Sequence, residues 1–313
     1  MSTASPLTVR IASRASQLAM WQARHVTELI RQVAPELTVE IVPVTTSGDA
    51  NQTDSLRSFG GLGVFTREVQ KLVQDGRADL AVHSLKDLPT AATPGLALAG
   101  VPDRAETADA FLAPSSRPEL VDLQQLPVGA RVGTGSLRRQ AQLLSVRPDL
   151  QLAEVRGNVD TRLRKLDEGE YDALILATAG LVRLGLGHRI RQRLGPPLML
   201  PAVGQGALGI ECRADDQVTC ELLGRLTNPR VLAEVTAERA LLAALRAGCH
   251  APVGAYCRAT EDRITLEAVV LSPNGAERVE ASGAARPEFA VELGRAVAEE
   301  LSRRGADRLL RQP

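Results

Sequence analysis

The sequence predicts an α/β protein with a smaller α+β part at its carboxyl end. In residues 7–193, short apolar segments alternate with segments of helical periodicity. Such alternation favours parallel βαβ units. Beyond residue 250 the pattern changes to three adjacent strand-like segments and one last helix.

The first βα series spans residues 7–101. Residues 7–12 alternate like a strand, and the apolar positions Leu18, Trp21, Val26 and Ile30 share one helical face. The expected strands are 7–12, 37–44, 78–83 and 96–101, and the expected helices are 16–33 and 64–75. The polar, glycine-bearing segment 45–63 predicts a long mobile loop.

A linker at 101–107 precedes the second series, and another is expected at 200–206. Expected strands are 130–133, 150–155 and 171–177, with helices at 136–146 and 159–168 and helical turns to about 193. Asn228 and Pro229 predict an N-cap and first helical residue. The last elements are strands 253–259, 264–271 and 276–284, and a helix at 288–303.

Composition excludes several classes. The 313 residues are 44% hydrophobic with zero formal net charge, enough for two or three domains and without the charge of a nucleic-acid or membrane-surface binder. There is no apolar run long enough to span a membrane and no export-signal pattern, so we expect a cytoplasmic protein. Four cysteines without a CxxC pair, and four histidines, predict no metal site.

The segment His83-Ser84-Leu85-Lys86-Asp87-Leu88-Pro89 follows the apolar run 78–82. It places Ser84, Lys86 and Asp87 at the carboxyl end of a buried strand, where ligands bind in open α/β sheets. A cation beside a carboxylate can tune that carboxylate for acid–base work. A surface Lys–Asp pair at an ordinary turn explains the spacing equally well.

Lysine occurs only at positions 71, 86 and 165, so arginine supplies nearly all the positive charge. In Gly133–Arg139, two arginines occupy the first turn of an expected helix, with Ser136 at its cap. Arginines there oppose the helix dipole, so a bound anion explains them better than local stability does. Arginines also follow other expected strands: Arg14, Arg156 with Arg162, and Arg183. Each alone is more simply a surface residue, but the set indicates a polyanionic ligand.

Cys249 lies in a Gly-Cys-His loop after a helix. An exposed cysteine beside His250 suggests a nucleophile, although a lone cysteine is more often a small buried apolar residue. Cys212 ends an apolar strand and is expected in the core.

Together these segments resemble the porphobilinogen deaminase family, also called hydroxymethylbilane synthases. The matches run in order over nearly the whole chain: Arg10–Arg14, His83–Pro89, Gly133–Gln140, Val155–Asn158 with Thr161 and Arg162, Leu200–Gly206, Gly209–Cys212 and Gly248-Cys249. The resemblance implies two type II periplasmic-binding-protein-like domains with mixed, mainly parallel sheets, and a smaller C-terminal α+β domain. The expected bounds are 1–102 with 207–224, 108–200, and 228–313.

The resemblance also implies a reaction. Family members join four porphobilinogen units head to tail with loss of ammonia, and hydrolysis frees the linear tetrapyrrole hydroxymethylbilane. The product grows on a dipyrromethane cofactor, which Cys249 would hold through a thioether. Porphobilinogen carries acetate and propionate groups, which gives the arginines a target. A monomer that acts on a small molecule, without metal or nucleotide, is expected.

Residue roles follow from the matching positions. Asp87 matches the family's catalytic aspartate, and a carboxylate there would stabilise the cation left when ammonia departs. Besides Cys249, the expected cofactor contacts are Ser84, Lys86, Ser136, Arg138, Arg139, Arg162 and Arg183. The expected substrate contacts are Ser13, Arg14, Ser16, Gln22, Phe65 and Arg156.

One loop departs from the family pattern. The family usually has GGKG where this chain reads Gly60-Gly61-Leu62-Gly63, and Ser58 matches a second common lysine. We expect weaker substrate binding or a slower loop step, with Arg57 or Arg67 as compensating cations.

Two other functions fit parts of the pattern. A non-catalytic anion-binding module on the same fold would need neither Asp87 nor a group on Cys249. An arginine-rich nucleic-acid binder is disfavoured by the zero net charge, the 2% aromatic content and the placement of the arginines at strand–helix junctions.

Overall fold

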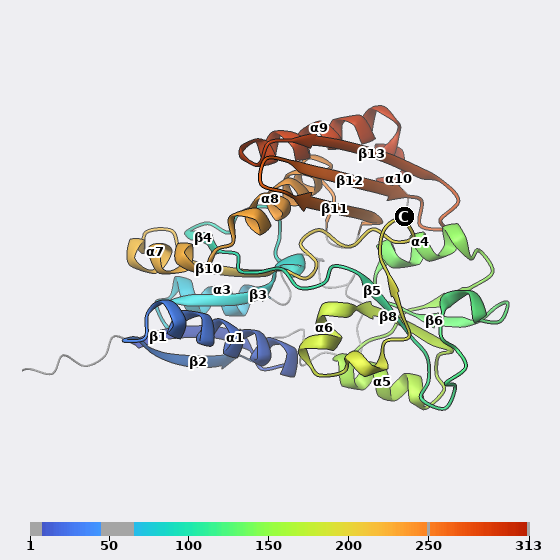
Figure 1. The fold of residues 1–313 in the computed structure, drawn as a ribbon, viewed down its shortest axis with the longest axis horizontal. Coiled ribbons are helices and arrows are strands. Elements are labelled where there is room, and N and C mark those ends of the chain that lie inside the picture. The colour runs from blue at the N-terminus through green and yellow to red at the C-terminus, as the bar shows by residue number, and fades with distance from the viewer. Residues whose placement is uncertain (1–7, 45–65, 249–250, 312–313) are drawn as a thin grey trace, which may run out of the picture. The chain divides into compact units, whose positions relative to one another are not determined.

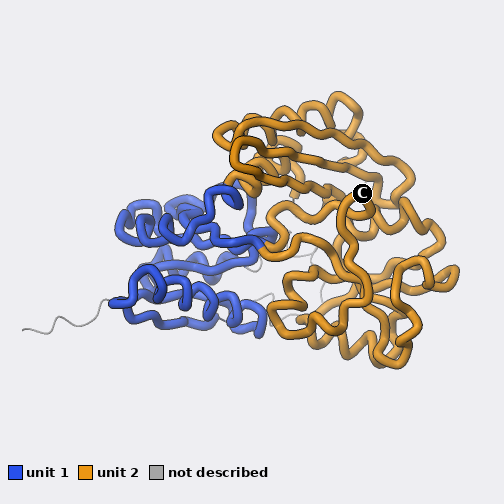
Figure 2. The backbone as a smooth tube through the Cα atoms, viewed as in Figure 1, with its two compact units in different colours: residues 1–104, 207–232 blue, residues 105–206, 233–313 orange. Residues whose placement is uncertain are grey.

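The computed structural model describes residues 8–44, 66–248 and 251–311. The chain forms two compact units, residues 1–104 with 207–232 and residues 105–206 with 233–313 (Figure 2). Phe65, Cys249 and the whole of the expected mobile loop 45–63 lie outside the described residues.

The first unit is built on a five-stranded sheet of order β2-β1-β3-β10-β4 (Figure 1). β1 pairs in parallel with β2 and β3, whereas β10 runs antiparallel to β3 and β4. The strands are β1 (Thr8–Arg14), β2 (Thr38–Val44), β3 (Leu80–Ser84), β4 (Leu96–Gly100) and β10 (Leu208–Arg213). The helices are α1 (Gln17–Val33), α3 (Arg67–Gln74), α7 (Gln217–Leu226) and the 3-10 turn η1 (Leu85–Asp87).

Both faces of this sheet are covered. Ile11 and Ala12, neighbours on β1, are both fully buried but belong to different clusters. Ile11 packs with residues of α1 and α7, and Ala12 packs with residues of α3. Strands buried on both faces read as continuous apolar runs, which is why the sequence marks them clearly.

The second unit contains a sheet of order β7-β6-β8-β5-β9, in which β6 is parallel to β7 and β8, and β5 is antiparallel to β8 and β9. Its strands are β5 (Asp109–Leu112), β6 (Arg131–Gly133), β7 (Gln151–Ala153), β8 (Ala173–Ala177) and β9 (Gln192–Leu194). Its helices are α4 (Leu137–Val146), α5 (Val159–Asp167) and α6 (Thr178–Arg183), with 3-10 turns η2 (Leu123–Gln125) and η3 (Gly187–Arg189).

The two sheets share one plan. In each order the fourth strand is the antiparallel one, β10 or β5, and each follows directly after a predicted linker. Two mixed sheets, each completed by a strand that enters after a crossing segment, confirm the predicted fold class.

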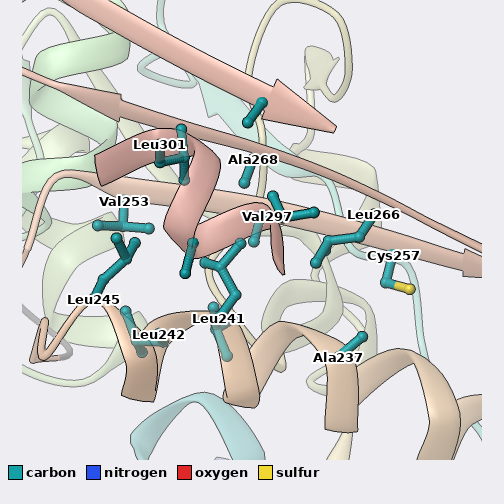
Figure 3. Close-up of a cluster of buried hydrophobic side chains, with 14 of the residues drawn as sticks. Ala237, Leu241, Leu242, Leu245, Val253, Cys257, Leu266, Ala268, Val297 and Leu301 are labelled. Carbon is teal, nitrogen blue, oxygen red and sulfur yellow. The ribbon is translucent and has the colours of Figure 1, made fainter. Parts of the chain in front are cut away.

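The remainder of the second unit is the predicted α+β part. Antiparallel strands β11 (Val253–Ala259), β12 (Ile264–Leu271) and β13 (Arg278–Ala285) pack against helices on one face. The helices are α8 (Pro229–Ala244), of which residues 233–244 belong to this unit, α9 (Ala290–Arg303) and α10 (Ala306–Leu310), and the 3-10 turn η4 spans Pro287–Phe289. Figure 3 shows side chains of α8, β11, β12 and α9 meeting in one cluster, where Leu241, Leu266 and Leu301 are fully buried.

The second linker is fastened to the edge strand β11. The amide of Ala255 donates to the carbonyl of Pro201, and Glu238 accepts from the amides of Cys257 and Gly204 at 3.0 and 2.8 Å. These bonds occupy an edge that would otherwise offer unpaired amides. The linker that precedes β10 is therefore held by the part of the chain that carries Cys249.

Among the helices that the structure describes, none is long and apolar enough to cross a membrane. Within the same residues no group of three or more histidine, cysteine, aspartate or glutamate side chains is placed to hold a metal ion.

Candidate functional site

The first part of the candidate site is the turn after β3. β3 ends in the 3-10 turn Leu85–Asp87, and Leu85 and Leu88 are buried on either side of Asp87. The amide of Leu85 donates to the carbonyl of Ala207 at 3.0 Å. A Cβ at Gly209 would lie 2.8 Å from Leu85 and 2.9 Å from Leu88, so only glycine lets the turn pack this closely. The turn is rigidly seated, with Asp87 on its outer side.

Lys86 is half-buried and Asp87 is exposed. Within the described residues, the carboxylate of Asp87 makes no hydrogen bond and no ion pair. An exposed carboxylate on a fixed turn at a strand's carboxyl end is available to a ligand.

The Ser84 side chain is oriented by a hydrogen bond from the buried side-chain amide of Gln22. Nε2 of Gln22, which is only 2% exposed, donates a 2.8 Å hydrogen bond to the Ser84 hydroxyl. Gln22 lies on α1, which follows β1, and Ser84 ends β3, so this bond joins α1 to the carboxyl end of β3. The structure thus brings together two residues that the resemblance put in the site.

The other predicted residues of this unit lie around the start of α1. The Ser16 hydroxyl caps α1 by accepting from the amide of Ala19, and the buried Ser13 hydroxyl donates to the Ala19 carbonyl at 3.1 Å. Both hydroxyls thus have a structural partner. Arg14 ends β1 and is half-buried. β1 and β3 are parallel neighbours, so Arg14 and Ser84 lie at the same edge of the sheet.

Three buried polar side chains, His83, Gln70 and Glu211, link β3 to the neighbouring strand β10 and to helix α3. Nε2 of His83 lies 3.1 Å from Oε2 of Glu211 on β10, and Gln70 donates to the same carboxylate oxygen at 2.8 Å. His83, Gln70 and Glu211 are all at least nine-tenths buried. Sequence reasoning missed this group, although Glu211 stands out as an acid inside the apolar strand 208–212.

In the second unit, Arg138 and Arg139 are buried and share one carboxylate. Nη1 of Arg138 lies 2.7 Å from Oδ2 of Asp109, and Nη2 of Arg139 lies 2.8 Å from Oδ1. Burial alone would raise the pKa of Asp109, but the two guanidinium groups hold it well below its usual range. Gln205 donates to the same carboxylate at 2.9 Å.

This geometry bears on one step of the sequence argument. Asp109 on β5 supplies one negative charge to the two arginines in the first turn of α4, so half of their charge is balanced within the protein. Asp109 was missed, and its only sequence signal is an acid within the apolar run 108–113. The role of Arg138 and Arg139 toward a cofactor stays a prediction.

The remaining arginines follow strands of the same sheet. Arg156 pairs with Glu154 at 2.6 Å, Arg162 donates to the carbonyl of Gly157 at 2.8 Å, and Arg183 donates to the carbonyl of Gly206 at 2.7 Å. Burial lowers the pKa of Arg183 to about 10. Because β6, β7 and β8 are parallel, the segments after them, including Ser136, share one sheet edge.

The buried polar atoms of this unit that lack a hydrogen-bond partner within the described residues include Nε of Arg138 and the hydroxyl of Thr178. Ser136 sits at the N-cap of α4, but its side chain makes no capping bond. This donor set, rich in guanidinium and hydroxyl groups, suits a ligand with several carboxylates.

Several solved structures are similar to this chain. The chain is similar to the Bordetella pertussis BvgS periplasmic VFT2 domain (15% identity, 70% of this chain and 86% of that chain, TM-score 0.42) and to the BenM effector-binding domain with its effector benzoate (15%, 71% and 93%, 0.42). It is also similar to the periplasmic aliphatic sulphonate binding protein SsuA from Escherichia coli (16%, 77% and 71%, 0.40).

Family models match most of the sequence. Residues 9–221 match the porphobilinogen deaminase, dipyrromethane cofactor binding domain, and residues 232–303 match the porphobilinogen deaminase, C-terminal domain. These matches confirm the resemblance expected from the motifs and the expected dipyrromethane cofactor. The chain therefore belongs to the porphobilinogen deaminase family of tetrapyrrole-synthesis transferases.

Proposed function

We propose that this protein joins four porphobilinogen units head to tail, with loss of one ammonia per unit, and frees hydroxymethylbilane by hydrolysis. Membership of the family supports the class of reaction. The observation that carries the site is the exposed Asp87 carboxylate on a turn whose flanking residues Leu85 and Leu88 are buried.

In this proposal, Asp87 stabilises the positive charge that develops on the substrate and then accepts a proton. When ammonia leaves porphobilinogen, the methylene carbon becomes cationic, and a fixed carboxylate nearby stabilises it. The free pyrrole carbon of the growing chain attacks this methylene carbon. Once the new carbon–carbon bond has formed, the Asp87 carboxylate accepts the proton that this pyrrole carbon loses. The seating of the turn matters, because a carboxylate that must reorganise stabilises a cation less well.

Ser84 and Lys86 bind and orient. The Gln22 amide fixes the Ser84 hydroxyl, and Lys86 adds a cation two residues further along the turn. A hydroxyl and an ammonium group at this spacing suit the acetate and propionate groups of porphobilinogen or of the cofactor.

The second unit would hold the carboxylates of the cofactor. When bound, the dipyrromethane supplies the free pyrrole carbon to which the first substrate unit is joined, and Cys249 would hold it through a thioether. Arg138 and Arg139 share the single carboxylate of Asp109, so the three side chains together keep one positive charge beside their directed N–H groups. Arg162 and Arg183 donate to backbone carbonyls, which orient a guanidinium without cancelling its charge.

Intact-mass measurement tests the proposal. The purified protein should carry the mass of two linked pyrrole units, and Cys249→Ser should lack it. On addition of porphobilinogen, the mass should rise in steps of one substrate unit less ammonia. Asp87→Asn should slow these steps, while the exposed Asp262→Asn leaves them unchanged.

The result can also contradict the proposal. A protein that binds porphobilinogen reversibly, with no added mass before or after incubation, would instead be an anion-binding module. Equal step rates for Asp87→Asn and the unmodified protein would remove Asp87 from the mechanism. The proposal includes a cytoplasmic monomer, which rests on family resemblance, and light scattering of the purified protein tests the monomer.

A further inference from the structure

Two cysteines that the proposed reaction does not use face each other in the first unit. Cys212 lies on β10 and Cys220 lies in the first turn of α7, and their Sγ atoms are 3.4 Å apart. Cys212 is fully buried, whereas Cys220 is partly exposed. The Sγ of Cys220 also lies 3.7 Å from the carbonyl oxygen of Arg213. The two sulfur atoms are already in van der Waals contact.

We propose that Cys212 and Cys220 form an oxidisable thiol pair, which hydroperoxides convert into an intramolecular disulfide. The sulfur atoms must approach from 3.4 Å to about 2.05 Å, a movement that side-chain rotation and a small shift of the first turn of α7 can supply. The two residues are close in sequence and belong to directly packed elements, so no distant segment has to move.

The steps balance with a hydroperoxide as oxidant. The sulfur of Cys220 attacks the peroxide bond, forms a sulfenic acid and releases water when the peroxide is hydrogen peroxide. The sulfur of Cys212 then attacks the sulfur of Cys220, the S–S bond forms, and the sulfenic oxygen leaves as a second water. Two thiols lose two electrons and two protons, and one peroxide becomes two waters.

Accessibility sets the order of the two residues. Burial, together with the nearby Cys220 thiol, raises the pKa of Cys212 to about 12, so Cys212 is a poor target for a solute peroxide. Cys220 is the side chain that solvent reaches. Cys212 therefore acts as the resolving residue, because it meets the oxidised Cys220 without leaving the core.

The bond would fasten α7 to the strand next to β3. Cys212 is paired with Leu80 in the β10–β3 ladder, and Leu208 of the same strand is paired with Ser84. Disulfide formation also removes the sulfenic acid before it reaches the irreversible sulfinic and sulfonic states. The pair would thus protect a strand neighbouring the candidate site from permanent oxidation.

Peptide mapping of the whole protein tests this. Trypsin should release residues 194–213, with Cys212, and residues 214–225, with Cys220, as separate peptides. After treatment with hydrogen peroxide and alkylation, a non-reduced digest should contain the two peptides joined, with two alkylatable thiols lost per chain. Reduction with dithiothreitol should restore both peptides and both thiols.

Cys220→Ser is the matched variant, because the residue is only partly buried. It should abolish the linked peptide, and Cys212 should stay unmodified at the same peroxide dose. Recovery of Cys220 as sulfinic acid without cross-link, or of a link to another cysteine, would overturn the proposal. The result is independent of the cofactor, since neither peptide contains Cys249.

Discussion

Nη1 of Arg138 lies 2.7 Å from Oδ2 of Asp109, and both side chains are almost wholly buried. This contact changes how the Gly133–Arg139 segment is understood. Its two arginines are held by a carboxylate of the same unit, on the strand β5 that the sequence does not reveal. Their geometry toward any ligand is therefore fixed by Asp109 before the ligand arrives.

Asp109→Asn should strongly destabilise the protein. The change leaves two buried guanidinium groups without a counter-charge, and breaking a buried ion pair in this way costs about 3–5 kcal/mol. Urea denaturation should show this loss in the free energy of unfolding. The exposed Asp262→Asn is the control and should change that free energy by less than about 0.5 kcal/mol.

The contribution of Asp109 to the free energy of unfolding should decrease as the pH falls. Its pKa is held well below the value of about 3.9 found in an unfolded chain, so at acidic pH the unfolded state binds the extra proton. The stability is therefore complete above about pH 4 and is lost as the pH falls further. The difference between the unmodified protein and Asp109→Asn should shrink below pH 4, and a constant difference would contradict this account.

Loss of the Gln22–Ser84 hydrogen bond should weaken substrate or cofactor binding more than folding. A net hydrogen bond is worth about 1 kcal/mol, or roughly fivefold in affinity. Gln22→Leu should raise KM by about that factor with a smaller change in kcat. Ser84→Ala should act through the same contact, so the double variant should be little worse than Ser84→Ala alone. If the two substitutions instead raised KM additively, Gln22 would not act through Ser84.

Glu211 should be needed to hold β3 in place. Glu211→Ala leaves the buried Gln70 amide without its carboxylate acceptor and removes the carboxylate beside His83, and we expect a loss of about 1–3 kcal/mol in unfolding free energy. Glu211→Gln keeps an acceptor oxygen and should lose less. Glu221, exposed on α7, gives the matched control, and Glu221→Ala should unfold at nearly the same urea concentration as the unmodified protein.

The sequence predicts the long, regular elements well. Helix α1 and strands β1 to β4 carry strong periodicity or apolar runs because each has a covered face. β5 and β9 are not found, because four- and three-residue strands are too short to show a period. β9 begins within the segment 178–193 that is expected to be helical.

The residues of the candidate site likewise divide into those that the sequence predicts and those that it does not. Motif matching finds Ser84, Asp87 and the arginines because the motifs are local in sequence. Asp109, Glu211 and Glu238 are missed, since each acts on residues at least 19 positions away and gains its meaning only from the fold. Helix α7, and hence the Cys212–Cys220 contact, is missed for the same reason.

Leu62→Lys tests the departure in the glycine-rich loop. The family pattern has a lysine at this position, and a cation there would help to bind an anionic substrate. We expect the variant to lower KM for porphobilinogen, and the effect should weaken as salt is raised because it is electrostatic. Leu62→Met, which adds length without charge, is the control. Unchanged kinetics for Leu62→Lys would show that other cations already compensate.

Replacing Gly206 should destabilise the protein, because both its backbone conformation and its close contact with Ala105 require glycine. Its φ is +86°, and a Cβ would collide with the carbonyl oxygen of Ala105. The Gly206 carbonyl also accepts hydrogen bonds from Arg183 and from the Ala105 amide. Gly206→Ala would have to push the two linker segments apart and so disturb both bonds.

Gly185 separates this effect from backbone strain alone. Its φ is +73°, but nothing lies within 4 Å of an added Cβ, so Gly185→Ala should cost only the left-handed backbone term of about 1–2 kcal/mol. Gly206→Ala should cost about 2 kcal/mol more, because two hydrogen bonds of about 1 kcal/mol each are strained as well. It should also raise KM, since Arg183 loses its anchoring carbonyl. Equal unfolding free energies for the two variants would mean that the linker segments yield without cost, and that Gly206 does not position Arg183.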